Sequence, residues 1–460
     1  MNIAPAWYNN RTYNMQDAFG AADITSVQMR KAISDWFGLY YNKTPTETED
    51  PCQQIPYTIV RKLTKTVFAE YTASSSDQFV QLVLDSLDPY RKQAVELALI
   101  GGECMLKPIP LTTPASWRWT AVSRDDLLVF ARDHAGRPSD IGITEHTVTS
   151  RYYYTLLERR TVDAAGYLTI HNRLYRAMNA GNLGQQVPLN TLEQYAELPD
   201  DYTFPQTVGS VGLVSVKTPV ANCVDGGPDG VSVYAAAVGL IHNIDRNEAQ
   251  LNGEFDRGES RIIASADLLR KGRDGERRFD DHLFVGMDDD PDSVGVTIFS
   301  PALREQSFLS RKQEYLRNVE SVIGLKRGLL SEVEAVERTA KEITSSEGDY
   351  NLTIIDFQEM WDDAVKEAVR LCGVLGQMYR VPGAHEPNED SFSIDWGNGV
   401  LYDEDKTWAD YLDMVARGLL KPEIALGWRF NLPTETPEDL ASIRAKYMPE
   451  LSQMAEDGEE

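Results

Sequence analysis

The sequence has few of the residues that build disulfide or metal sites. Its four cysteines, Cys52, Cys104, Cys223 and Cys372, are spread widely over 460 residues. Such spacing fits neither a disulfide framework nor a zinc motif, so we expect reduced and mostly buried thiols. The six histidines are also scattered, and no two are four residues apart, the spacing that places two imidazoles on one helix face. We therefore expect no metal site and no metal-dependent enzyme.

Long apolar runs are missing as well. The longest, Tyr234–Ile241, is far shorter than the roughly 18 residues that a membrane-spanning helix needs. The first residues lack a basic stretch followed by an apolar one, so no secretory signal is expected. These absences predict a soluble protein that is made and folded in the cytoplasm and has no membrane partner.

Positive charge is scarce. The chain has 45 Lys and Arg against 71 Asp and Glu, a formal net charge of −26. A protein that grips nucleic acid by neutralising phosphates needs concentrated Lys and Arg, so the charge argues against that class. It leaves open a protein past which DNA slides.

Motifs for catalysis or cofactor binding are incomplete. Gly226, Gly227 and Gly230 lack the Gly-Lys-Ser/Thr of a phosphate-binding loop, so we interpret them as the start of a helix. The string 209–212 is one residue too short for a serine nucleophile elbow. The acidic run 288–292 lacks the Gly and Glu that complete a calcium loop, which favours a solvated turn. We expect no catalytic residue and no cofactor.

The patterns that are present predict an α+β fold. Residues 1–100 have helical periodicity at 24–37, 56–71 and 90–100, whereas short strands rich in aromatic and β-branched residues occupy 101–220. The predicted strands are 117–119, 127–130, 147–158 and 167–176. Helices and strands thus fall in separate blocks instead of alternating as in a nucleotide-binding sheet.

Two long helices, 231–258 and 302–323, are expected to flank a compact insertion with strands at 261–264 and 294–299. At 1.5 Å per residue the helices would be about 42 and 33 Å long. A third long helix is predicted over 349–379. Short helices at 404–417, 422–428 and 437–447 are expected to follow an acidic strand region at 386–402.

Basic residues are concentrated near these helices. Residues 257–278 have seven basic and four acidic side chains, and 302–327 have six and three, whereas 279–301 have six acids and no base. Such clusters are either ordinary helix-end charges or a surface that faces DNA or a partner.

Five strings in this order support a resemblance. They are Ile55–Val60, Tyr152–Glu158, Glu254–Leu269, Phe299–Arg304 and Arg338–Ile343, the last with a Thr-Ala-x-Glu-Ile element. Together with the order of helices and insertion, they make the chain resemble the portal proteins of tailed bacteriophages, in particular those of long-tailed phages of Gram-positive hosts. The segment 326–337 is more charged than the tunnel loop of that family.

The resemblance implies a portal fold with an α/β wing, a long-helix stem, a small α/β clip and a helical C-terminal crown. It maps the wing to 1–227 and 341–400, the latter with the long helix, and the stem to 228–258 and 302–323. The clip is mapped to 259–301, the tunnel loop region to 324–340 and the crown to 401–460.

The resemblance also implies a ring, usually of twelve subunits, at one vertex of the virion capsid, assembled in the host cytoplasm. Through it double-stranded DNA would be packaged and ejected, with terminase, head–tail adaptor, major capsid and scaffolding proteins as partners. Candidates for the channel are the basic residues Arg311, Lys312, Arg317, Lys326 and Arg327. Candidates for partner contacts in the clip are Arg270, Lys271, Arg273, Arg277 and Arg278.

Two alternatives stay open. One is a different virion structural protein, such as a head–tail adaptor or a capsid component. The other is an acidic hydrolase that uses carboxylate pairs, since 71 acidic residues make some such pair inevitable. For the channel cations, the alternative is ion pairing with Glu314 or Glu320 across a subunit interface.

Overall fold

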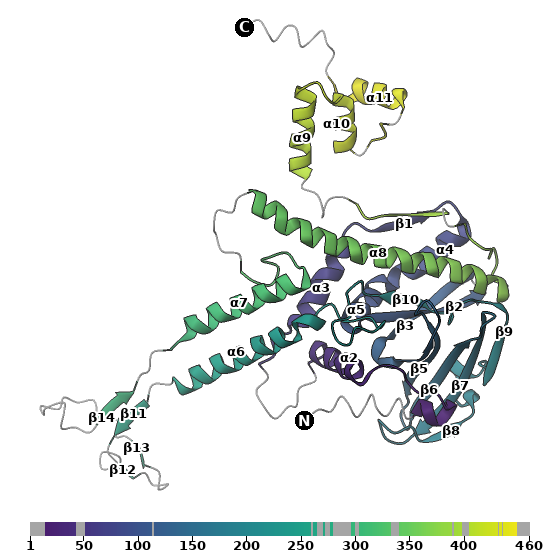
Figure 1. The fold of residues 1–460 in the computed structure, drawn as a ribbon, viewed down its shortest axis with the longest axis horizontal. Coiled ribbons are helices and arrows are strands. Elements are labelled where there is room, and N and C mark those ends of the chain that lie inside the picture. The colour runs from purple at the N-terminus through teal and green to yellow at the C-terminus, as the bar shows by residue number, and fades with distance from the viewer. Residues whose placement is uncertain are drawn as a thin grey trace, which may run out of the picture. The chain divides into compact units, whose positions relative to one another are not determined.

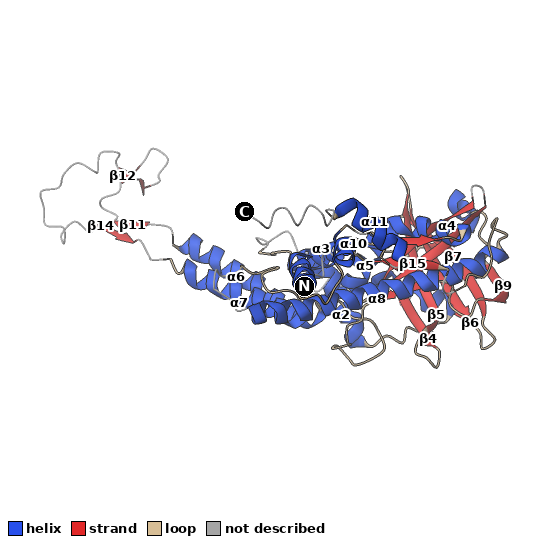
Figure 2. Ribbon diagram, turned by 90° about the horizontal axis from the view of Figure 1, so that it is seen from above, coloured by secondary structure: helices blue, strands red, loops and turns tan. Residues whose placement is uncertain are grey.

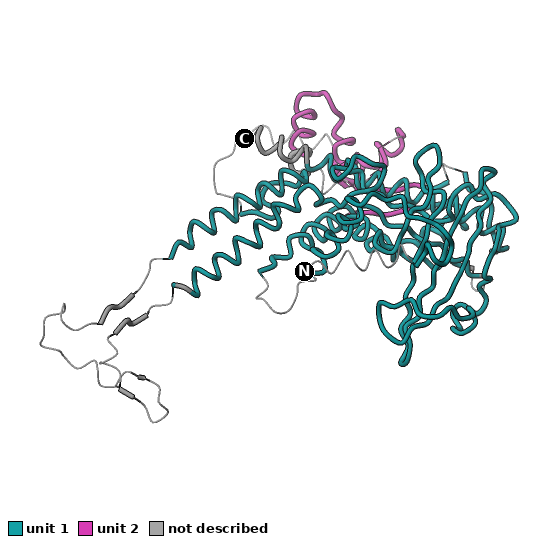
Figure 3. The backbone as a smooth tube through the Cα atoms, turned by 60° about the horizontal axis from the view of Figure 1, so that its bottom comes forward, with its two compact units in different colours: residues 1–67, 74–392 teal, residues 68–73, 393–460 magenta. Residues whose placement is uncertain are grey.

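The computed structural model describes most of the chain. The described residues are 14–42, 51–112, 115–258, 261–264, 270–271, 277–278, 296–299, 303–332, 340–388, 391–397, 404–430, 432–434 and 436–448. The chain divides into two compact units (Figure 3). Unit 1 comprises residues 1–67 and 74–392, and unit 2 comprises 68–73 and 393–460.

Helices α2 to α5 precede the main strands of unit 1 (Figure 1). They are α2 (Val27–Tyr40), α3 (Ile55–Val67), α4 (Gln78–Leu87) and α5 (Arg91–Gly101). Helix α3 forms because its apolar residues recur on one face, where Ile59, Val60 and Leu63 are fully buried. Three of these helices confirm the periodicity of the sequence. Helix α4 was not predicted, although Asp77 caps it by accepting a hydrogen bond from the Phe79 amide at 2.9 Å.

The strands between residues 103 and 217 form two antiparallel sheets in unit 1, which confirms the α+β class. The first has the order β10-β2-β3, and the second has the order β4-β5-β6-β7-β8 with β9 also paired to β7. The strands are β2 (Glu103–Thr112), β3 (Ala115–Ser123), β4 (Leu127–Arg132), β5 (Pro138–Val148), β6 (Tyr153–Val162), β7 (Tyr167–Ala177), β8 (Gln185–Val187), β9 (Asp201–Thr207) and β10 (Val214–Lys217). Short strands β1 (Thr72–Ser75) and β15 (Phe392–Asp395) lie at the boundary of the units in sequence.

One predicted strand is wrong. Residues 147–158 form not a single strand but the end of β5 and most of β6, which are joined by a turn. In that turn the Thr149 amide donates to the Tyr152 carbonyl at 2.9 Å. The aromatic run 152–154 concealed the turn, because the turn contains neither Gly nor Pro.

A close contact between two backbones joins α5, β2 and the segment that leads to the long helices. Gly102 has a φ of +86°, and a Cβ atom there would lie 2.3 Å from the Gly230 carbonyl carbon. A Cβ on Gly230 would lie 2.2 Å from the Gly102 oxygen. Thr218 donates a hydrogen bond to the Val231 carbonyl at 2.7 Å and so closes the same corner.

The long helices of unit 1 are α6 (Val238–Arg257), α7 (Glu305–Ile323) and α8 (Ala340–Met378). Helix α6 begins later than predicted, after a 3₁₀ turn at Ala235–Ala237. The apolar stripe starts earlier because Tyr234 is a core residue, whose hydroxyl donates to the Trp36 carbonyl at 3.0 Å. The glycines at 226–230 therefore form a turn rather than a helix start.

Helix α8 packs against α3, α4, β2 and β10 (Figure 1). Its inner face is made of large apolar residues, among which Ile354, Trp361 and Leu371 are fully buried. This face explains why so long a helix is stable, since tertiary burial and not intrinsic propensity supplies most helix stability.

Unit 2 contains three short helices near the C-terminus. They are α9 (Glu404–Ala416), α10 (Pro422–Arg429) and α11 (Pro437–Tyr447), and all three were predicted. Thr436 and Asp439 form a capping box at the start of α11. Among the described helices of both units, none is both long and apolar enough to cross a membrane.

The cysteines agree in part with expectation. None of the four, all of which the structure describes, forms a disulfide, but only Cys104 and Cys372 are buried, whereas Cys52 is half-buried and Cys223 is exposed. Burial raises the pKa of the Cys104 and Cys372 thiols, so neither is a reactive thiolate near neutral pH.

Candidate functional site: the α6–α7 pair and the following loop

Helices α6 and α7 lie side by side and run antiparallel (Figures 1 and 2). The buried amide of Asn247 donates to the Phe308 carbonyl at 3.0 Å. Near the distal end of the pair, Arg304 donates two hydrogen bonds to Glu254, at 3.0 and 2.8 Å. Polar bonds thus fix the register of a pair whose apolar stripe is interrupted.

Lys312 is held within the chain. Its Nζ lies 2.9 Å from a Glu248 oxygen and 2.7 Å from the Gln53 side-chain oxygen. Glu248 is the residue that interrupts the apolar stripe of α6, so the interruption provides the partner for this lysine. Lys312, one of the five channel candidates, therefore has its charge paired within the chain by a residue of α6.

Arg311 has a partner on its own helix. Its guanidinium lies 3.0 Å from Glu314 and 4.4 Å from the centre of the Tyr315 ring. Glu314 is one of the two acidic residues given above as alternative partners across a subunit interface, and within the chain it is a neighbour of Arg311 one turn away. Both members of this pair are more than half exposed, and such pairs contribute about 0–1 kcal/mol.

The remaining channel candidates lie further along the chain. Arg317 is half-buried on α7, whereas Lys326 and Arg327 are exposed in the segment directly after the helix. Helix α7 ends at Gly324, which has a φ of +78°. The chain can therefore turn sharply there and present Lys326 and Arg327.

A buried carboxylate organises this segment. Glu320 is 1% exposed and accepts hydrogen bonds from the amides of Gly328 at 3.2 Å and Ser331 at 2.8 Å, and from the Ser331 hydroxyl at 2.8 Å. Lys62 also donates to the Leu329 carbonyl. We call residues 324–332 the anchored loop. Backbone amides thus bind both oxygens of Glu320, which is one of the two acidic residues given above as alternative partners for the channel candidates.

The clip candidates are described by their backbone alone. Strands β11 (Arg261–Ala264) and β14 (Val296–Phe299) were both predicted, and they pair with each other; β12 (Arg270–Lys271) pairs with β13 (Arg277–Arg278). The register places Arg270 opposite Arg278 and Lys271 opposite Arg277. Four candidates therefore share one small ladder, whereas Arg273 lies outside the described residues.

A groove opens between α6 and α7. Its volume is about 490 Å³, and it is lined by Asn243, Arg246, Asn247, Gln250, Ser307, Phe308, Arg311 and Tyr315. Two arginines and three side-chain amides face it, and no acidic side chain lines it. Arg246, which lies on α6, was not among the predicted site residues, because only the apolar stripe of that helix was used to interpret its sequence.

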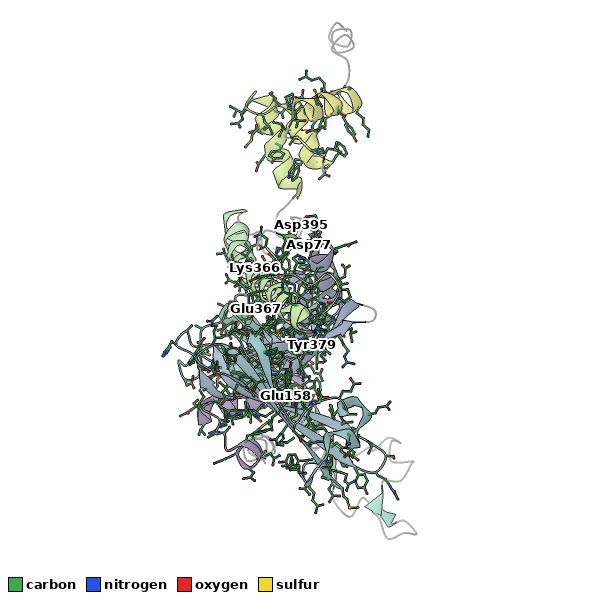
Figure 4. All side chains as sticks on the ribbon, turned by 90° about the vertical axis from the view of Figure 1, so that its right-hand side faces the viewer. Asp77, Glu158, Lys366, Glu367, Tyr379 and Asp395 are labelled. Carbon is green, nitrogen blue, oxygen red and sulfur yellow. The ribbon has the colours of Figure 1, made fainter. Side chains whose placement is uncertain are left out.

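A second cavity, of about 160 Å³, lies where the larger sheet meets the end of α8. Glu158 and Tyr379 both line it, and Figure 4 shows where each lies. Burial raises the pKa of Glu158, but the charges of Arg160 and Lys107 outweigh it and lower the pKa to about 2. A carboxylate that stays ionised at neutral pH is poorly suited to general acid–base catalysis.

The described residues offer little for metal chemistry. Among them, no group of three or more His, Cys, Asp or Glu side chains could hold a metal ion. The acidic run 288–292, which was interpreted as a solvated turn, lies outside the described part of the chain.

Comparisons with known proteins give similarity at the level of structure. No family model matches the chain, and no curated protein matches it. A chain from the neck of a native GTA particle, computed with C12 symmetry, is similar with a TM-score of 0.44 and 12% identity, over 92% of this chain and 99% of that one. A chain from the virion of a native gene transfer agent (GTA) particle is similar with a TM-score of 0.46 and 12% identity, over 93% of this chain and 99% of that one.

A chain from the neck of an empty GTA particle, computed with C6 symmetry, gives a TM-score of 0.46 and 11% identity, over 88% of this chain and 98% of that one. These descriptions name no Gram-positive host, so the host type expected from the sequence stays a prediction. Because all three TM-scores are low, the function proposed next depends on the residues of this chain.

Proposed function

We propose that the chain is the subunit of a portal ring, through whose channel double-stranded DNA passes into and out of a capsid. The observation that carries the proposal is the α6–α7 pair. Two long antiparallel helices are interrupted by an insertion and continue into the anchored loop, which presents Lys326 and Arg327. This is the layout that the resemblance to portal proteins maps to a stem, a clip and a tunnel loop region.

The charge distribution supports a channel for mobile DNA. A subunit with a formal charge of −26 repels phosphate on average, so it does not grip a duplex. A few exposed cations at one height along the channel would still hold DNA loosely. Lys326 and Arg327 are the better candidates for that contact, because both are exposed on the anchored loop directly after α7.

The proposal includes no catalytic role for the chain. A packaging motor that hydrolyses ATP would be a partner, together with adaptor, capsid and scaffolding proteins. In the part of the chain that the structure describes, the buried Glu158 is paired with cations and so is not poised as a general acid or base.

Electron microscopy of the purified protein tests the class. We expect rings with an open axial hole, because a subunit with two different faces closes into a ring through heterologous contacts. Compact monomers at high protein concentration would contradict the proposal.

The loop contact is tested by Lys326→Ala/Arg327→Ala, with Arg151→Ala, an exposed arginine between β5 and β6, as the control. The double variant should assemble as well as the wild type but package or retain DNA poorly. Normal packaging, or failure only because rings no longer form, would show that the loop has a structural role.

A further inference from the structure

The groove between α6 and α7 contains a cation that lacks a partner. Arg246 is exposed, and among the described residues no acidic side chain forms an ion pair with it. Arg311, on the other side of the groove, has only the exposed Glu314 as an acidic partner. The groove is thus a positively charged surface on a strongly acidic molecule.

Helix α8 has a complementary surface. Leu352, Asp356, Glu359 and Asp363 recur at spacings of three and four, so they form one exposed stripe. Asp356 and Glu359 have no cationic partner within the described chain, and Asp363 has only Lys366 at 3.6 Å. We call these four residues the acidic stripe.

The two surfaces match in length as well as in charge. The acidic stripe extends for about 16 Å along α8, and the α7 side of the groove, from Ser307 to Tyr315, for about 12 Å. At one end of the stripe Leu352 is 62% exposed, and Phe308 and Tyr315 give the groove an apolar part. A helix laid in the groove would therefore gain both ion pairs and apolar contact.

We propose that the groove of one subunit receives the acidic stripe of a second copy of this chain. The pairing rests on the proposed ring, because a heterologous contact needs two different complementary patches on each subunit. Charges that meet in this way set the register and reject wrong pairings more than they add affinity. An unpaired Arg246 and an unpaired Asp356 and Glu359 are then the two halves of one interface.

The pairing is tested by reversing each half separately. The groove variant is Arg246→Glu/Arg311→Glu, and the stripe variant is Asp356→Lys/Glu359→Lys. Each alone should remain a folded monomer, because like charges would then meet at every contact. Mixed in equal amounts, the two should form rings in which they alternate, since each reversed patch then meets an opposite charge. Such rings contain an even number of subunits.

Mass photometry and negative-stain images measure the assembly, and circular dichroism checks the fold. The controls are Arg151→Glu and Glu197→Lys, two exposed residues outside the helix pair, which should assemble like the wild type. Suppose that the wild type forms rings. If either charge-reversed variant also forms rings alone, or if the two variants stay folded monomers when mixed, the pairing is overturned and the ring proposal stands. A wild type that stays monomeric under all conditions would overturn both.

Discussion

Single buried charges fix much of the architecture of unit 1. Asp229 is 9% exposed and accepts hydrogen bonds from Arg124 at 3.0 Å and Arg132 at 2.7 Å, so it joins the turn before α6 to β4. Glu158 of β6 joins the two sheets through Lys107 of β2, and Arg160 on its own strand also donates to it. Such groups are costly to bury, and removing one partner leaves the other uncompensated.

Glu158→Ala should therefore destabilise unit 1 by about 3 kcal/mol, because it leaves two cations without their carboxylate. The pKa of Glu158 lies near 2, below its ordinary value of 4.5, so ionised Glu158 stabilises the fold. Its contribution is fully present above about pH 4.5 and is lost as the pH falls towards 2. Thermal unfolding of the variant and the wild type across this range should converge at low pH. A constant difference, or one equal to that of the exposed control Glu197→Ala, would contradict the assignment.

At the scale of elements, the end of α7 depends on one side chain. Glu320 accepts hydrogen bonds from the amides of Gly328 and Ser331 and from the Ser331 hydroxyl. These bonds attach the anchored loop to the helix that precedes it. Each buried amide that loses its acceptor costs about 1–3 kcal/mol.

Glu320→Ala should therefore open the anchored loop without unfolding α7. Hydrogen–deuterium exchange at Gly328, Leu330 and Ser331 should become at least about tenfold faster, which corresponds to about 1.4 kcal/mol of lost protection. Glu314→Ala, on the exposed face of the same helix, is the matched control and should leave these amides unchanged. Lys62 donates to the Leu329 carbonyl, and the Thr353 hydroxyl donates to the Gly324 carbonyl at 3.3 Å. Equal exchange in the two variants would show that these two contacts, not Glu320, hold the loop.

Elements whose signal is local could be predicted from the sequence. The strand segments β11 and β14 and the helices α9, α10 and α11 follow from periodicity and turn residues, whereas the pairing of β11 with β14 was not predicted. The start of α6 could not be predicted, because a buried Tyr234 looks the same whether it belongs to a helix or to an extended core segment. The site was predicted in part: the sequence shows that Arg311 and Lys312 are basic, but not that Glu248, Gln53 and Tyr315 lie beside them.

At the scale of the whole molecule, net charge opposes assembly. Each subunit has a formal charge of −26, and the repulsion between neighbours extends over the Debye length. A close ion pair across an interface is screened less than this long-range repulsion.

Ring formation should therefore increase as the ionic strength rises from about 0.01 to 0.1 M, where the Debye length falls from about 30 to 10 Å. Mass photometry at fixed protein concentration measures the fraction of subunits in rings. A fraction that falls over this range would mean that attractive pairs, and not net repulsion, dominate the balance between subunits.

The corner where Gly102 meets Gly230 limits how this chain can evolve. Any side chain at either position would have to occupy space already filled by the other backbone, and no movement of a flexible neighbour can relieve the clash. By contrast, Gly239 on α6 has nothing within 4 Å of the place where its Cβ would lie. A side chain at Gly239 therefore has room, whereas the two positions where the helix pair is attached to the rest of unit 1 each require glycine because of the other.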